Sequence, residues 1–125
     1  MELLAARKRP AQFSNLRPGS SMCAQNVVDE AGEVLGSIVD LLFDLERGRI
    51  AYAVVASAGF MGLGERLVAV PWNALKAETR KFVLQGKRSA LDSGPAFECE
   101  RWHRPPAKGW HERVHAHFGT RPYWE

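Results

Sequence analysis

The sequence predicts an all-β domain, a small antiparallel β-barrel, on three observations. Short runs rich in branched and aromatic residues recur along the chain, separated by clusters of Gly, Pro and Asp. No long amphipathic helix lies between these runs, so the crossover helices that parallel strands need are missing. The length of 125 residues and the apolar fraction of 46% suit one soluble domain with its own core.

The predicted strands follow one another at short intervals. The run over 33–45 alternates with a period of two, and Gly36 within it indicates a bulge or a sharp bend. The run over 50–57 is apolar on both faces, as in a central strand. Pro71 ends the next strand and favours one helical turn over 72–75. Strands are expected over residues 22–28, 33–45, 50–57, 66–70 and 81–85, whereas 89–92 is too short to assign. One face of the run over 33–45 is expected to hold Leu35, Val39, Leu41, Phe43 and Leu45.

The two ends of the chain differ from the predicted barrel, which is placed at 20–98. Residues 1–19 combine basic side chains with Pro and Gly, so a flexible basic arm is expected there. Residues 99–125 are rich in His and Trp and contain a predicted helix over 108–118, with Gly119 as its C-terminal cap. The apolar stripe of this helix is expected to be Trp110, Val114, His117 and Phe118.

The net charge of +3 comes entirely from these two ends. Residues 1–20 carry four basic and one acidic side chain, and residues 101–125 carry five and two. Residues 21–100 carry eight basic and eleven acidic side chains, so the predicted barrel is acidic. Nucleic-acid binding normally needs a basic face on the folded unit, so it is not expected of the barrel.

Nothing in the sequence marks the chain for a membrane or for export. No apolar run approaches the ~20 residues of a membrane span, and the charges near the start follow the apolar patch, the reverse of a secretory signal. A cytoplasmic location is therefore expected. Cys23 and Cys99 are then expected to be free thiols rather than a disulfide.

A glycine-rich loop follows the run over 50–57. It resembles a phosphate-binding loop, but a strand rather than a helix follows it, so the glycines are interpreted as serving a tight connection. Its apolar side chains either cap the barrel or form a docking patch for a partner. The partner-binding residues are predicted to be Gly59, Phe60, Met61, Gly62, Leu63, Gly64 and Trp72.

Two carboxylates, Asp40 and Asp44, share one face of the run over 33–45. Four residues along a strand span ~13 Å, which is too far for a shared proton or ion. A solvated face of the barrel is therefore the preferred interpretation.

The strongest enzymatic pattern is His-Glu-x-x-His at His111, Glu112 and His115. Two His one helical turn apart can bind one Zn²⁺, and the Glu can activate a bound water. A third ligand is not apparent, because Phe118 and Arg121 stand where the extended protease pattern has Gly and His. A non-catalytic zinc site remains an alternative, with candidate ligands Cys99, His103, His111, His115 and His117.

The preferred interpretation of this segment needs no metal, and no cofactor is expected. The helix packs Trp110, Val114 and Phe118 on the barrel and leaves His111 and His115 in solvent. The segment also holds five of the twelve aromatic residues of the chain. Aromatic residues interleaved with basic ones can stack on single-stranded nucleic acid, but packing on the domain or bridging two subunits is favoured here because the barrel is acidic.

Several segments together resemble the PRC-barrel domain family. They are 32–40 and 48–55 for its opening, 59–65 with 70–72 and Leu75 for its second half, and 95–97 for its exit. That family includes the cytoplasmic domain of photosynthetic reaction-centre H subunits and the C-terminal domain of the ribosome-maturation factor RimM. The resemblance implies a small antiparallel barrel used mostly as a binding module, and it does not extend to either end of the chain.

Three functions follow as hypotheses. The first is a non-enzymatic adaptor that binds another protein, or a second copy of itself as a homodimer, because an open barrel leaves strand edges that need cover. The second is a ribosome- or RNA-associated module similar to RimM. The third is a zinc-binding protein that uses the His-rich C-terminal segment.

Overall fold

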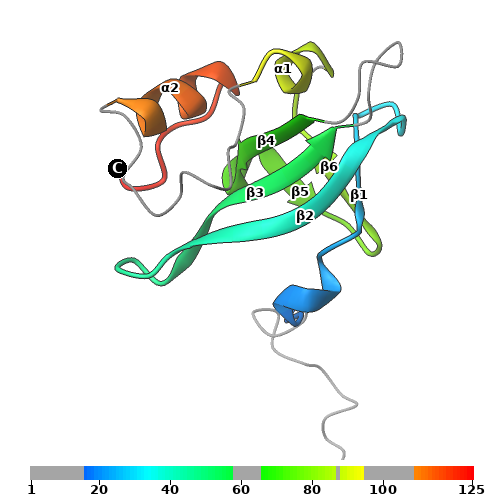
Figure 1. The fold of residues 1–125 in the computed structure, drawn as a ribbon, viewed down its shortest axis with the longest axis horizontal. Helices are drawn as coiled ribbons and strands as arrows, with labels where there is room; N and C mark the ends of the chain where they lie inside the picture. The colour runs from blue at the N-terminus through cyan, green and yellow to red at the C-terminus, as the bar shows by residue number, and fades with distance from the viewer. Residues whose placement is uncertain (1–15, 58–65, 87, 95–108) are drawn as a thin grey trace, which may run out of the picture.

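The computed structural model describes residues 16–57, 66–86, 88–94 and 109–125, and their six strands form one curled sheet (Figure 1). The sheet has the order β4-β3-β2-β1-β6-β5. Two short helices lie on the same side of it, above β4 in Figure 1. The elements are β1 (Asn26–Val28), β2 (Val34–Asp44), β3 (Arg49–Ser57), β4 (Arg66–Pro71), β5 (Leu75–Ala77), β6 (Lys81–Leu84), α1 (Arg88–Asp92) and α2 (Trp110–His117).

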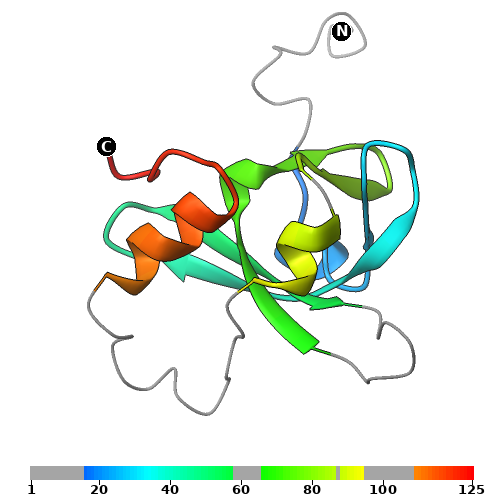
Figure 2. The ribbon, with the colours of Figure 1, turned by 90° about the horizontal axis from the view of Figure 1, so that it is seen from above.

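The sheet is a half-barrel, which confirms the all-β prediction with a C-terminal helix (Figure 2). It departs from a fully antiparallel barrel at one place. β1 pairs with β6 in parallel, whereas the other four pairings are antiparallel. A parallel pair needs a long connection, and here the connection consists of the intervening strands themselves, so no crossover helix is required.

β3 is the most buried strand, as its two apolar faces predict. Its residues from Ala51 to Ser57 are all buried. β2 and β4 flank it through antiparallel ladders that run along most of its length. The core of the domain is therefore assembled around this strand, and both of its faces contribute to it.

Three irregularities along β2 change which of its side chains are buried. Leu35 is skipped in the pairing with β1 and Val39 in the pairing with β3, and Ala51 of β3 is skipped between Leu42 and Phe43. Each extra residue shifts the alternation by one position. The predicted common face is therefore wrong: Leu35, Ile38 and Leu41 are buried, whereas Val39, Phe43 and Leu45 are exposed.

Gly36 lies beside the first irregularity, which confirms the predicted bulge or bend at this position. A Cβ on Gly36 would sit 2.3 Å from the carbonyl oxygen of Ala56, a backbone atom that cannot yield. Glycine here permits β2 and β3 to approach closely where the sheet bends.

Among the shorter elements, one matches its prediction and others differ from theirs. The predicted turn after Pro71 is a 3₁₀ turn at Trp72–Ala74. β5 was not predicted, and the unassigned residues 89–92 belong to α1. The strand predicted over 22–28 begins only at Asn26, because Ala24 has a left-handed φ of 73°. Cys23 is a half-buried free thiol, and Cys99 lies outside the described residues.

Of the predicted N-terminal arm over 1–19, the structure describes only 16–19. There the Arg17 guanidinium donates a hydrogen bond to the carbonyl of Glu78 at 2.9 Å. The boundaries of the arm and of the barrel stay predictions.

α2 ends where the glycine signal predicts. The amide of Gly119 donates a hydrogen bond to the carbonyl of Ala116, and the amide of Thr120 donates one to the carbonyl of His115 at 2.9 Å. With Gly119 at a φ of 68°, this pattern is a Schellman cap.

The buried face of α2 differs from the prediction at two histidines. Val114 and Phe118 are buried as expected, but His115 is fully buried, not in solvent. His117, predicted in the apolar stripe, is exposed. Adjacent helical positions lie 100° apart, and the helix is rotated so that 114 and 115 both face the sheet. None of the helices in the described part of the chain is long and apolar enough to span a bilayer.

Candidate functional site

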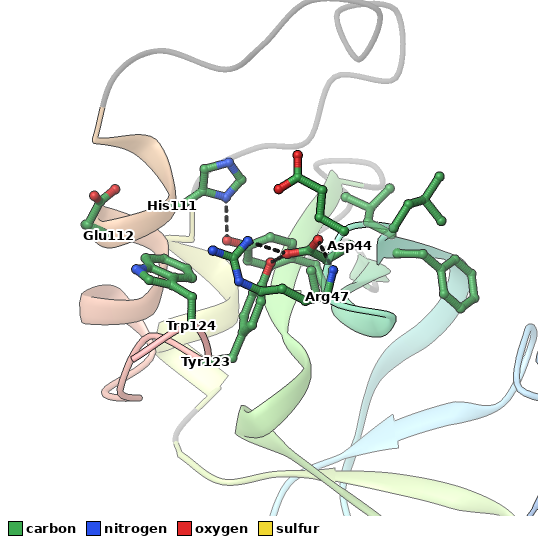
Figure 3. A pocket seen from close by; sticks show the side chains of 12 residues that line it. Asp44, Arg47, His111, Glu112, Tyr123 and Trp124 are labelled. Atoms are coloured by element: carbon green, nitrogen blue, oxygen red, sulfur yellow. Dashed lines mark hydrogen bonds and ion pairs between the residues drawn. The ribbon is translucent and has the colours of Figure 1, made fainter.

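A groove lies between the β2–β3 hairpin and the C-terminal part of the chain (Figure 3). Its volume is about 570 Å³. One wall comes from the end of β2 and the hairpin turn, the floor from β3, and the other wall from α2 and the C-terminal tail, residues 119–125. Its lining consists of Leu42, Phe43, Asp44, Leu45, Glu46, Arg47, Ala51, Tyr52, His111, Glu112, Tyr123 and Trp124.

The tail is fastened to the hairpin through Tyr123 and Asp44. The Tyr123 hydroxyl donates to Oδ2 of Asp44 at 2.6 Å. Arg47 donates to the same carboxylate twice, from its guanidinium at 3.1 Å and from its backbone amide at 3.0 Å. The guanidinium of Arg49 lies over the Tyr123 ring, 4.4 Å from its centre. Both walls of the groove are therefore held together at this point (Figure 3).

These contacts shift two pKa values. The Tyr123 hydrogen bond, with the Arg47 backbone bond second, lowers the pKa of Asp44 from 3.8 to about 2. Burial, and then the bond to Asp44, raises the pKa of Tyr123 to about 12. Near neutral pH a charged carboxylate therefore accepts from a neutral phenol, which is the stronger form of this hydrogen bond.

The floor of the groove carries a second polar contact. The hydroxyl of Tyr52 lies 2.7 Å from Nδ1 of His111. Burial raises the pKa of Tyr52 and lowers the pKa of His111. The hydrogen bond is thus formed between an uncharged phenol and an uncharged imidazole, and it joins α2 to β3 beneath the groove.

His115 lies behind this pair in an aromatic cluster. Its Nδ1 is 2.8 Å from the carbonyl oxygen of His111, one turn earlier. Its ring packs edge-on against Tyr52 at 5.5 Å and Trp124 at 5.0 Å between ring centres. Its Nε2 is buried and has no hydrogen-bond partner in the described part of the chain. The residue therefore acts mainly as an aromatic core side chain.

The described part of the predicted zinc set does not converge. Nδ1 of His111 contacts Tyr52, His115 is enclosed, and Nε2 of His117 lies 2.7 Å from the carbonyl of Ala90. Among the described residues, no three His, Cys, Asp or Glu side chains are grouped to hold a metal ion. Cys99 and His103 lie outside the described residues.

A serine and a histidine approach each other on the surface between the helices. The Ser93 hydroxyl lies 3.5 Å from Nε2 of His117. The hydroxyl donates instead to the carbonyl of Ser89 at 2.6 Å, and the imidazole nitrogen faces the Ala90 carbonyl. With Nε2 protonated to donate to that carbonyl, it is not available as a base for Ser93.

The predicted partner-binding residues are only partly described. Gly59, Phe60, Met61, Gly62, Leu63 and Gly64 lie outside the described residues. Trp72 is half-buried, with its ring centre 5.6 Å from that of Phe82, so part of its surface belongs to the core.

Sequence reasoning missed the apolar tip of the hairpin. Phe43 is 56% exposed and Leu45 is 89% exposed, and both line the groove. It also treated Asp44 as a solvated residue, whereas the Asp44 side chain is 12% exposed and bonded to the tail. The available signal was an apolar run that continues to the turn at Gly48, but the irregularities in β2 concealed which residues face outward.

The curled sheet and its short helices define a small half-barrel domain. The family model of the PRC-barrel domain matches residues 15–91, more than half of the chain. The chain belongs to the PRC-barrel domain family. No curated protein matches it.

The matched span includes the six strands of the described part of the chain and all of α1 except Asp92, but not α2 or the tail. Asp44 and Tyr52 therefore belong to the family domain, whereas His111, Glu112, Tyr123 and Trp124 come from beyond it. The groove forms where this additional C-terminal part meets the PRC-barrel.

Proposed function

We propose that the protein is a non-enzymatic adaptor that binds a protein partner at the groove and at the exposed tip of the β2–β3 hairpin. The observation that carries this proposal is the exposure of Phe43 and Leu45 beside a groove of about 570 Å³. Neighbouring apolar side chains exposed at the edge of a cavity are typical of an interaction site.

The fastening of the tail supports the same function. The Tyr123–Asp44 and Tyr52–His111 bonds hold both walls of the groove in place without a ligand. A preformed site loses less conformational entropy on binding than one that must be ordered by its partner. The groove is thus suited to recognition.

The test compares two variants of the full chain in an affinity pull-down from the native organism. Phe43→Ser with Leu45→Ser removes the exposed apolar tip, and Val34→Ser is the matched control, a half-exposed apolar residue at the other end of β2. We expect the tip variant to lose partners that the control retains. Equal recovery of every partner by both variants would contradict the proposal.

Light scattering on the same variants tests self-association. If the partner is a second copy, the unchanged chain is a dimer, and the tip variant dissociates at concentrations where Val34→Ser does not. The loop at 59–64 stays a predicted second contact. Phe60→Ala with Met61→Ala in the same assays tests it separately from the hairpin tip.

A further inference from the structure

The carboxylates of the groove are not all neutralised. The groove contains three carboxylates, Asp44, Glu46 and Glu112, against the single guanidinium of Arg47. Arg47 is already paired with Asp44 at 3.1 Å. Glu46 and Glu112 are exposed, and neither has an ion-pair partner in the described residues. Among the described residues that line the groove, two carboxylates are therefore without an ion-pair partner.

These two charges come from opposite walls. Glu46 lies in the hairpin turn, and Glu112 lies in the first turn of α2. The lining also includes aromatic and apolar side chains, among them Tyr52, Trp124 and Leu42. An occupant that suits both features has a positive charge near the rim and an apolar side chain that lies against the floor.

We infer that the groove recognises a short segment of a partner protein in which a Lys or Arg stands beside an apolar residue. This inference rests on the proposed function and names the chemistry of its partner. The cation lies between Glu46 and Glu112, while the neighbouring apolar residue packs against Phe43, Leu45 and the aromatic lining.

The carboxylates, rather than the tyrosine at the rim, select the cation. Arg49 already covers the ring of Tyr123 at 4.4 Å, so a ligand cation gains little from that ring. Asp44 is occupied by Tyr123 and Arg47. Glu46 and Glu112 are left to carry the charge selectivity.

Nucleic acid does not fit this surface. A phosphate backbone is repelled by the two free carboxylates, and Arg47 and Arg49 are both engaged within the protein. A single-stranded oligonucleotide therefore serves as a contrasting probe.

Exposed ion pairs are individually weak, which sets the expected size of the effect. Each carboxylate contributes roughly a two- to fivefold change in affinity, and the effect decreases as salt rises. Loss of both carboxylates is expected to weaken binding by about tenfold if they act independently.

The experiment selects peptides from a displayed library of random dodecapeptides on the immobilised full chain. The affinity of a selected, fluorescently labelled peptide is then measured by anisotropy with the unchanged chain, with Glu46→Gln plus Glu112→Gln, with Phe43→Ser plus Leu45→Ser, and with Glu30→Gln. Glu30 is an exposed carboxylate in the β1–β2 turn, away from the groove, and is the matched control. Circular dichroism verifies that all variants are folded.

The expected result is enrichment of Lys or Arg beside apolar residues, with weaker binding by the double Gln variant and unchanged binding by Glu30→Gln. Peptides without basic residues that still require Phe43 and Leu45 would overturn the inference and leave the proposed function standing. Selection of no peptide, or of peptides insensitive to both the Gln and the Ser variants, would overturn both.

Two further outcomes identify a different occupant. Competition of the selected peptide by a single-stranded oligouridylate would contradict a protein ligand. Competition by a peptide with the sequence of residues 1–15, together with dimerisation of the full chain, would assign the groove to a second copy and overturn a separate partner.

Discussion

The hydroxyl of Tyr123 donates a hydrogen bond to the carboxylate of Asp44 at 2.6 Å, between residues that are 79 positions apart. Asp44 ends β2 within the family-matched span, whereas Tyr123 belongs to the tail beyond it. This contact joins the additional C-terminal part to the PRC-barrel and fixes the width of the groove.

Removal of the Tyr123 hydroxyl is expected to loosen the tail without unfolding the domain. Tyr123→Phe keeps the ring beneath Arg49 but leaves Asp44 with Arg47 alone. We expect roughly three- to tenfold faster amide exchange in residues 120–125, with little change in β3. Arg47→Ala, which retains the Tyr123 bond, is the control and should have a smaller effect on the tail. Equal effects would show that the hydroxyl does not hold the tail.

The attachment of the tail should persist in mild acid and weaken between about pH 4 and pH 2. The pKa of Asp44 is depressed from 3.8 to about 2, so the attached state disfavours protonation. Its contribution is fully present above about pH 4 and is lost as the pH falls through about 2. NMR shifts of the tail between pH 6 and pH 2 measure this directly. In Asp44→Asn the tail should be loosened already at pH 6, and release of the unchanged tail near pH 5 would contradict the assignment.

Substitution of Gly36 should strongly destabilise the sheet. The added methyl group in Gly36→Ala meets the Ala56 carbonyl oxygen at 2.3 Å and forces β2 away from β3. We expect a loss of about 3 kcal/mol in the free energy of unfolding, measured with urea. Gly19→Ala is the control, because its nearest contact is an ordinary 4.0 Å to Leu41, and its effect should stay within about 0.5 kcal/mol. Similar losses in the two variants would mean that β2 and β3 are not in close contact at this point.

His115 should be replaceable by an apolar residue of similar size but not by a small one. Its ring fills space between Tyr52 and Trp124. Leucine would lose only the contact of Nδ1 with the His111 carbonyl, because Nε2 has no hydrogen-bond partner among the described residues. We expect His115→Leu to change the free energy of unfolding by no more than about 1 kcal/mol, and His115→Ala to reduce it by about 3 kcal/mol. Urea denaturation of both variants measures the difference. If leucine is as harmful as alanine, the imidazole has a polar role, such as metal binding, that its contacts do not reveal.

The sequence predicted those parts of the fold that depend on local pattern. The two-sided apolar run at 50–57 became the central strand β3, and Gly119 ended α2 through a Schellman cap. β5 was not predicted, because a strand of three residues is too short to show an alternating apolar pattern. The parallel pairing of β1 with β6 escaped it because local pattern does not specify which distant strands meet.

The candidate site was less accessible to sequence reasoning. Register shifts along β2, the last of them between Leu42 and Phe43, leave Phe43 exposed although Leu41 two residues earlier is buried, and alternation alone cannot reveal such shifts. His115 was assigned to solvent because a polar residue one turn after His111 suggests a shared exposed face. Its burial depends on the rotation of α2 against β3, a tertiary property.

The parallel pairing of β1 with β6 has a consequence for the order of folding. The β2–β3 hairpin closes a short loop, whereas Val27 can meet Phe82 only after most of the domain has assembled. Loop closure over a longer stretch has a larger entropic cost, so this pairing should form late and separate early. Val27→Ala, which shortens this side chain, is then expected to increase the unfolding rate and leave the folding rate nearly unchanged. The pairing of β1 with β6 is thus expected to determine how fast the folded domain unfolds.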